Sequence, residues 1–151
     1  MNAWEQLCNN KILISAVTGW FTAQVLKTII HLIISRHFSA ERLIGSGGMP
    51  SSHSSTVCAL AAATCIEYGL NSYEFAIATT FAIVVMYDAM GVRRETGKQA
   101  IILNEMINLF TDMGNSLKTP KEKLKEFVGH TPLQVLMGAI LGILIAMLIY
   151  M

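Results

Sequence analysis

The sequence predicts an all-α integral membrane helical bundle that forms a single domain over residues 1–151. Hydrophobic residues make up 53% of the chain and charged residues only 14%, against roughly 25% charged in an average soluble domain. Four apolar segments come close to the length of about 20 residues that a helix needs to cross a bilayer. We expect about four transmembrane helices, at residues 12–35, 54–70, 73–90 and 133–151.

The four segments differ in composition. The first is long enough to span with tilt, the third is shorter, and the last is almost uninterrupted apolar sequence. The second segment is marginal by itself and is rich in alanine, with Cys58 and Cys65 inside it. Small residues allow helices to approach closely in a membrane, so this segment is expected to pack against other helices rather than face lipid.

The connection between the third and fourth segments, residues 91–132, is polar and rich in lysine. Within it, residues 100–110 have the pattern of a short amphipathic helix. The run Thr119-Pro120-Lys121-Glu122 is a capping box with proline at the first helical position. A second short helix should therefore extend from there to Gly129.

Basic residues lie in two of the three connections between spans. Arginines or lysines occur between the first and second spans and between the third and fourth, whereas residues 71–74 carry none. In a chain with four spans these two basic connections share one face, which the positive-inside rule makes cytoplasmic. The sequence thus predicts a cell-membrane protein with both termini outside.

Residues 45–57, GSGGMPSSHSSTV, lead directly into the second span. A helix N-terminus presents backbone N–H groups without helical partners and the positive end of the helix dipole, and the two together favour a bound phosphate. Ser51, Ser52 and His53 stand at this position. The simpler alternative is that a serine only caps the helix and that His53 is a polar residue at the membrane interface.

A second histidine stands at the start of the last span. In GHTPLQV, residues 129–135, His130 directly precedes Thr131 and Pro132, so the topology brings His53 and His130 to the same face. Neither histidine is followed at three or four residues by another His, Cys or carboxylate, so the spacing does not fit a zinc site. We predict no metal and no cofactor.

Charged residues in or beside the spans add candidates for a phosphate site. Lys27 lies within the first span, and an ionisable residue at membrane depth is a functional candidate by default. Asp88, Arg93 and Arg94 lie at the end of the third span. As alternatives, Lys27 extends to the surface or pairs with Asp88, and Asp88 only anchors an arginine.

Three motifs in order, GGMPSSHSSTV, VVMYDAMGVRRETGKQAIILN and GHTPLQVLMG, together resemble the divergent branch of the type-2 phosphatidic acid phosphatase superfamily. This superfamily is related to vanadium haloperoxidases and membrane lipid phosphatases. The resemblance covers most of the chain. The loop from Pro50 to His53 is similar to a P-S-G-H motif, with Ser52 in place of glycine, and His130 is similar to the histidine of a second motif.

The resemblance implies metal-independent hydrolysis of a lipid or prenyl phosphate monoester or diphosphate. His130 would attack phosphorus to give a phosphohistidine, and His53 would protonate the leaving group. Other residues would bind the phosphate oxygens. By the resemblance these are Lys27, Ser51, Ser52 and Arg93 or Arg94.

Gln134 occupies the position where the superfamily has a carboxylate that orients the nucleophilic histidine. Its amide oxygen can accept a hydrogen bond from the imidazole of His130 and so hold one tautomer, but it offers no charge to an imidazolium. Gln134 also completes a capping box with Thr131. Either function explains a glutamine here.

Two other classes of protein remain open. A non-catalytic membrane protein could bind or move a phosphorylated lipid with the same pocket, and Gln134 favours this reading. The paired histidines favour an enzyme, because binding alone needs neither a nucleophile nor an acid. The hypothesis of a vanadate-dependent peroxidase rests on analogy alone.

The expected partners are the bilayer and a phosphorylated lipid. The chain lacks a basic stripe with interleaved aromatic residues, so nucleic acid is not expected as a partner. Homo-oligomerisation is left open.

Overall fold

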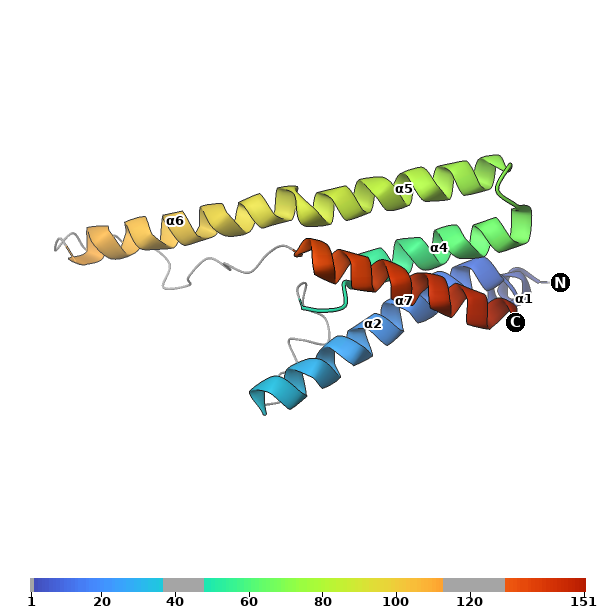
Figure 1. The fold of residues 1–151 in the computed structure, drawn as a ribbon, viewed down its shortest axis with the longest axis horizontal. Coiled ribbons are helices and arrows are strands. Elements are labelled where there is room, and N and C mark those ends of the chain that lie inside the picture. Colours follow the sequence, from blue (N-terminus) through green and yellow to red (C-terminus); the bar gives the residue numbers. More distant parts are fainter. Residues whose placement is uncertain (1, 37–47, 113–129) are drawn as a thin grey trace.

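A computed structural model describes residues 2–36, 48–112 and 130–151, and every regular element in these ranges is an α-helix. Four helices, α2, α4, α5 and α7, form the bundle; α2 and α5 run in one direction and α4 and α7 in the other, and both termini lie at the same end (Figure 1). The predicted all-α fold is confirmed. The helices are α1 (Ala3–Cys8), α2 (Lys11–Ser35), α4 (Ser52–Tyr68), α5 (Tyr73–Met90), α6 (Val92–Asp112) and α7 (Pro132–Tyr150).

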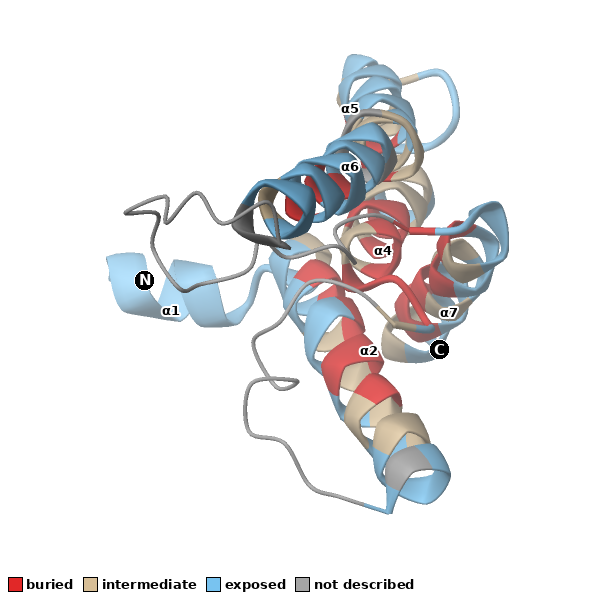
Figure 2. Cartoon of the chain, turned by 90° about the vertical axis from the view of Figure 1, so that its left-hand side faces the viewer, coloured by how far each residue is buried: buried red, intermediate tan, exposed pale blue. Residues whose placement is uncertain are grey.

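The central helix of the bundle is α4, which packs against α2, α5 and α7. Its buried residues are nearly all small, and they form much of the red interior in Figure 2. Ala59 and Ala63 are fully buried, as expected for a helix that meets its neighbours closely. The prediction that the alanine-rich segment packs inside the protein is therefore confirmed.

Glycines on the neighbouring helices allow this close approach. A Cβ atom added at Gly138 of α7 would lie 3.0 Å from the Cβ of Ser54 and would collide with the Ser51 carbonyl oxygen. One turn further along α7, a Cβ at Gly142 would collide with the Ser55 carbonyl oxygen. The two glycines form a G-x-x-x-G pattern, which brings helix backbones together in membranes. The start of α7 is thereby fixed against the start of α4.

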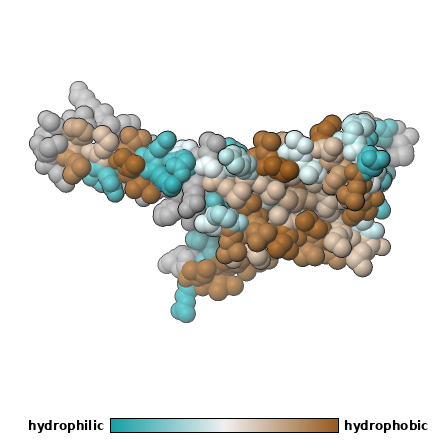
Figure 3. Space-filling view, turned by 45° about the horizontal axis from the view of Figure 1, so that its top comes forward, coloured by the Kyte–Doolittle hydropathy of each residue, from teal (hydrophilic) through white to brown (hydrophobic). Residues whose placement is uncertain are grey.

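Among the residues that the structure describes, three stretches are long and apolar enough to cross a membrane: Lys11–Ile34, Tyr73–Phe110 and Pro132–Tyr150. Large apolar side chains cover the flank of the bundle seen in Figure 3. Phe21, Ile83 and Leu148 are large apolar residues that are each more than half exposed. Such a surface needs lipid around it. The expected number of about four spans is approximate, because the 17-residue α4 is shorter and lies among the other helices.

The helix that follows α5 is longer than the sequence predicts. An amphipathic helix is expected at residues 100–110, but α6 begins at Val92, directly after Gly91, and continues from the end of α5 (Figure 1). An ion pair of 2.6 Å between Glu95 and Lys98 stabilises the polar first turns of α6. The second short helix, predicted to run from Thr119, lies outside the described residues.

Candidate functional site

The first turn of α4 is fixed by its own serines. Ser51 is the N-cap, and its hydroxyl oxygen accepts hydrogen bonds from the Ser54 amide (3.3 Å) and the Ser54 hydroxyl (3.1 Å). The Ser51 N–H donates to the carbonyl oxygen of Gln134 at 3.0 Å. Ser51 therefore caps the helix and ties α4 to α7, so its amide is already engaged within the protein.

The two histidines of the sequence motifs lie side by side. The ring centroids of His53 and His130 are 5.7 Å apart, and the rings are inclined at 57°. His130 is 3% exposed, and its backbone N–H donates to the carbonyl oxygen of Ala89 at 3.1 Å. Because Ala89 lies in the last turn of α5, three helices hold the pair: α4 carries His53, α7 follows His130, and α5 anchors it.

Gln134 makes both of the contacts expected from its position. Its side-chain oxygen Oε1 accepts from the Thr131 N–H at 3.1 Å and lies 3.3 Å from Nδ1 of His130. The Thr131 N–H is a donor, so the atom it meets must be the amide oxygen rather than the nitrogen. The Nδ1 atom facing that oxygen then carries the proton. The lone pair of the His130 ring is consequently on Nε2.

Lys27 is buried beneath the loop that precedes α4. The side chain is 3% exposed, which is inconsistent with the alternative that it extends to the surface. A Cβ atom at Gly48 would lie 3.0 Å from both Cγ and Cδ of Lys27, and Gly48 has φ +92°. The lysine stem therefore passes directly under Gly48, where the backbone conformation favours glycine.

A buried amide lies one turn before Lys27 on α2. Gln24 is 6% exposed, and its Oε1 atom has no hydrogen-bond partner among the described residues. Buried polar atoms are usually paired, and an unpaired one costs stability. An unpaired amide next to a buried lysine indicates a polar space at this level of the bundle rather than apolar packing.

The remaining predicted site residues are described only in part. Asp88 lies half-buried in the last turn of α5, next to the residue that anchors His130. The backbones of Arg93 and Arg94 lie in the first turn of α6, and their side chains are outside the described part of the structure. Ser52 is buried in the first turn of α4.

No metal centre is evident in the part of the chain that the structure describes. Within residues 2–36, 48–112 and 130–151, no three or more His, Cys, Asp or Glu side chains are grouped so that they could hold a metal ion. The expectation that the protein uses no metal stays a prediction.

Sequence reasoning missed three supporting residues. Gly138 and Gly142 could have been found as a G-x-x-x-G pattern within an apolar segment. The glycines before Pro50 indicate a close backbone approach from the sequence alone, but not that Gly48 lies against Lys27. The Ala89 carbonyl that anchors His130 has no sequence signal, because any residue supplies a carbonyl oxygen.

The fold and the paired histidines define a class of protein: a helical membrane protein with a polar site at one end of its bundle. Residues 8–145 match the family described as the Divergent PAP2 family, and the chain belongs to this family. A similar protein is "Uncharacterized membrane protein YuiD" of Bacillus subtilis (strain 168), which is 39% identical over 152 residues, covering 95% of this chain and 96% of the relative. No solved structure matches the chain.

The predicted family resemblance and the membrane location are thereby confirmed. The catalytic activity, the substrate, the roles of the individual residues and the orientation in the membrane stay predictions.

Proposed function

We propose that this protein hydrolyses a lipid or prenyl phosphate monoester or diphosphate through a phosphohistidine on His130, without a metal ion. One observation carries the proposal. Two imidazoles from motifs far apart in the sequence lie with their centroids 5.7 Å apart, so one phosphoryl group can touch both. A nucleophile and a general acid are the two groups that such a two-step hydrolysis needs.

In the first step, Nε2 of His130 attacks phosphorus. The hydrogen bond from Nδ1–H to Gln134 leaves the lone pair on Nε2, as an attacking nitrogen requires. The N–P bond forms while the bond from phosphorus to the ester oxygen breaks. Protonated His53 gives its proton to the departing oxygen, so that an alcohol leaves rather than an alkoxide.

In the second step, water replaces the histidine. His53, now neutral, takes a proton from a water molecule that attacks phosphorus, and the N–P bond breaks as the new O–P bond forms. Inorganic phosphate leaves, His130 regains its lone pair on Nε2 and His53 is again protonated. The cycle consumes one water molecule and needs no redox partner.

The negative charge of the phosphoryl group is balanced by groups at the start of α4 and in α2. Lys27 is a cation held at 3% exposure, and a fixed charge away from water stabilises a transition state more than the same charge in solvent. The Ser52 amide, in the first turn of α4, has no helical carbonyl opposite it. Arg93 or Arg94 is proposed to complete the phosphate site.

The active-site end of the bundle is proposed to face the cytoplasm. The connections at this end carry most of the lysines and arginines of the chain, which favours that orientation under the positive-inside rule. A single cysteine placed at Ser72, in the connection at the opposite end, in a chain whose three native cysteines are replaced, tests this. Labelling of intact cells by an impermeant thiol reagent supports the orientation, and labelling only after lysis contradicts it.

One observation favours a second candidate, a protein that binds a phosphorylated lipid without hydrolysing it. The partner of His130 Nδ1 is a neutral amide, at 3.3 Å. An amide holds the tautomer but adds no negative charge to stabilise a positively charged phosphohistidine. In this second reading the histidines bind the phosphate as hydrogen-bond donors.

The experiment that separates the two candidates is phosphate release by purified protein in detergent, in the presence of EDTA, from a panel of lipid and prenyl phosphates. His130→Ala and His53→Ala are compared with His31→Ala, a histidine variant outside the pair. Release that survives EDTA and disappears only in the two paired variants supports the phosphatase. Lipid phosphate that binds but is never hydrolysed supports the binding protein and contradicts the enzyme.

A further inference from the structure

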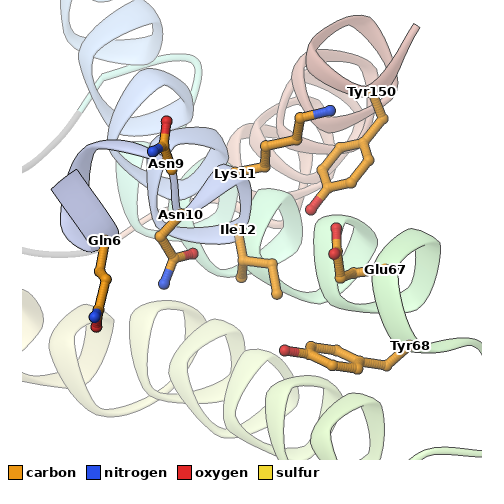
Figure 4. A pocket seen from close by; sticks show the side chains of 8 residues that line it. All are labelled: Gln6, Asn9, Asn10, Lys11, Ile12, Glu67, Tyr68 and Tyr150. Atoms are coloured by element: carbon orange, nitrogen blue, oxygen red, sulfur yellow. The ribbon is translucent and has the colours of Figure 1, made fainter. Parts of the chain in front are cut away.

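The end of the bundle that carries the termini holds a polar pocket far from the histidines. Its volume is about 380 Å³, within the range of roughly 300–1,000 Å³ that small-molecule sites occupy. The linker after α1, the start of α2 and the ends of α4 and α7 form its walls (Figure 4). The histidines lie at the other end of α7, a helix length of roughly 28 Å away.

Two opposite charges face this pocket and are separated by an aromatic ring. The Nζ atom of Lys11 lies 5.2 Å from the centroid of the Tyr150 ring. The Tyr150 hydroxyl points toward the carboxylate of Glu67, on the other side (Figure 4). Lys11 and Glu67 are both exposed. The pocket therefore presents a positive and a negative pole to the same ligand.

The pocket lies at the depth of phospholipid head groups. The apolar stretch of α2 begins at Lys11, and that of α7 ends at Tyr150, so both residues mark the boundary of the hydrocarbon layer. Trp4, Tyr68 and Tyr73 are exposed at this end, and exposed Trp and Tyr are typical of a membrane interface. The short helix α1 extends sideways from the bundle (Figure 2), as an interfacial segment does.

We propose that this pocket binds a phosphoethanolamine group, which carries one phosphate and one primary ammonium, as the head group of a phospholipid. Lys11 pairs with the phosphate, and the Glu67 carboxylate accepts hydrogen bonds from the ammonium N–H groups. The Tyr150 hydroxyl, which points toward Glu67 (Figure 4), lies at the ammonium end of the site. The proposal concerns a second site and does not depend on the activity of the histidine end.

This arrangement discriminates between head groups. A choline ammonium has no N–H to donate to Glu67, so it forgoes the charge-assisted hydrogen bonds. A glycerol head group has no cation, so its hydroxyls meet Glu67 without charge complementarity. Phosphatidylethanolamine satisfies both poles.

The test is native mass spectrometry of the full chain, released from nanodiscs that contain equal amounts of phosphatidylethanolamine, phosphatidylcholine and phosphatidylglycerol with identical acyl chains. The wild type is expected to retain phosphatidylethanolamine about fivefold over each of the others, the size expected of an exposed charge pair. Glu67→Gln should abolish the preference over phosphatidylcholine. Glu74→Gln, the same charge change at the start of α5, should keep it.

A second arm identifies the source of the head group. Soluble glycerophosphoethanolamine is added as a competitor to the wild type and to Lys11→Gln. Displacement of the retained lipid only in the wild type supports a pocket that recognises the head group itself, free or lipid-borne. No displacement, with the lipid preference intact in the first arm, supports recognition at the bilayer surface. Equal retention of the three lipids, or a preference that Glu67→Gln leaves unchanged, overturns the proposal.

Discussion

The two ends of the bundle differ in how far their polar residues are buried. At the histidine end, Gln24, Lys27 and His130 are at least nine-tenths buried, among fully buried serines of α4. At the end with the termini, Lys11 and Glu67 are exposed at the boundary of the apolar layer. Polar groups cost little where they meet water, whereas burial of a charge is costly without compensation.

The difference indicates where selection for function acts. An exposed lysine at the membrane boundary needs no special explanation, since such residues are favoured there. A lysine kept at 3% exposure inside the bundle carries a stability cost that an apolar residue of the same size would avoid. We therefore expect the histidine end to be the functional part of the molecule, at some cost in folding stability.

The largest effect is expected at His130. Replacement by alanine removes the proposed nucleophile, and phosphate release should fall by at least about 10³-fold, the scale seen when a covalent nucleophile is deleted. The measurement is the rate of phosphate release at saturating substrate. His31→Ala should stay within about twofold of the wild type on the same scale, and an equal loss in both variants would attribute the effect to folding.

The second-largest effect on phosphate release is expected at Lys27, and Lys11, at the other end of the bundle, serves as the control. Lys27→Met should reduce phosphate release by roughly 10²-fold, because the cation proposed to bind the phosphoryl group is lost, whereas Lys11→Met should leave the rate unchanged. Thermal unfolding in detergent, measured for both variants, separates a loss of folded protein from the loss of the cation. If Lys27→Met retains full activity, Lys27 does not bind the phosphate.

The third effect compares one glycine from each end. Gly142→Ala should destabilise the bundle by about 1–3 kcal/mol, because the new methyl group collides with the Ser55 carbonyl oxygen at the α4–α7 contact. Gly69→Ala meets no atom within 4 Å, but its φ of +82° and ψ of 164° lie in a region that is essentially restricted to glycine, so about 1–3 kcal/mol is expected from backbone strain alone. Denaturation in detergent measures both. The account of α4 packing is wrong if Gly142→Ala leaves the stability unchanged.

The smallest effect is expected at Gln134. Gln134→Glu keeps the capping box with Thr131 and the acceptor for His130 Nδ1 but adds a negative charge. Phosphate release should rise several-fold, since a carboxylate stabilises the positively charged imidazole. The rate is measured beside the wild type with the same substrate. An unchanged or lower rate would mean that the neutral amide is already suited to this site.

The overall fold was predictable because it depends on hydropathy and residue size. The apolar segments located α2, α5 and α7, and the alanines of α4 indicated its central position. The length of α6 was not predicted, because the polar residues after Met90 have the composition of a connection, whereas a new helix begins at Val92, directly after Gly91.

The motifs of the candidate site could be predicted from the sequence, but the contacts between them could not. The topology placed His53 and His130 on one face, and the structure brings their centroids to 5.7 Å. The sequence could not give the bond from the Ser51 amide to Gln134, because a backbone contact between distant segments leaves no residue-type signal. Because that bond occupies the Ser51 amide, the proposed site uses the Ser52 amide to bind the phosphate.

The central claim is that His130 becomes phosphorylated, and the most direct measurement is to trap that intermediate. In His53→Ala, p-nitrophenyl phosphate should still phosphorylate the enzyme, because its leaving group needs no acid, while hydrolysis slows without a base. Alkaline quenching and peptide mass spectrometry should then find phosphohistidine at His130, and none in the double variant that also carries His130→Ala. Release of p-nitrophenol with no phosphate on His130 would contradict the account.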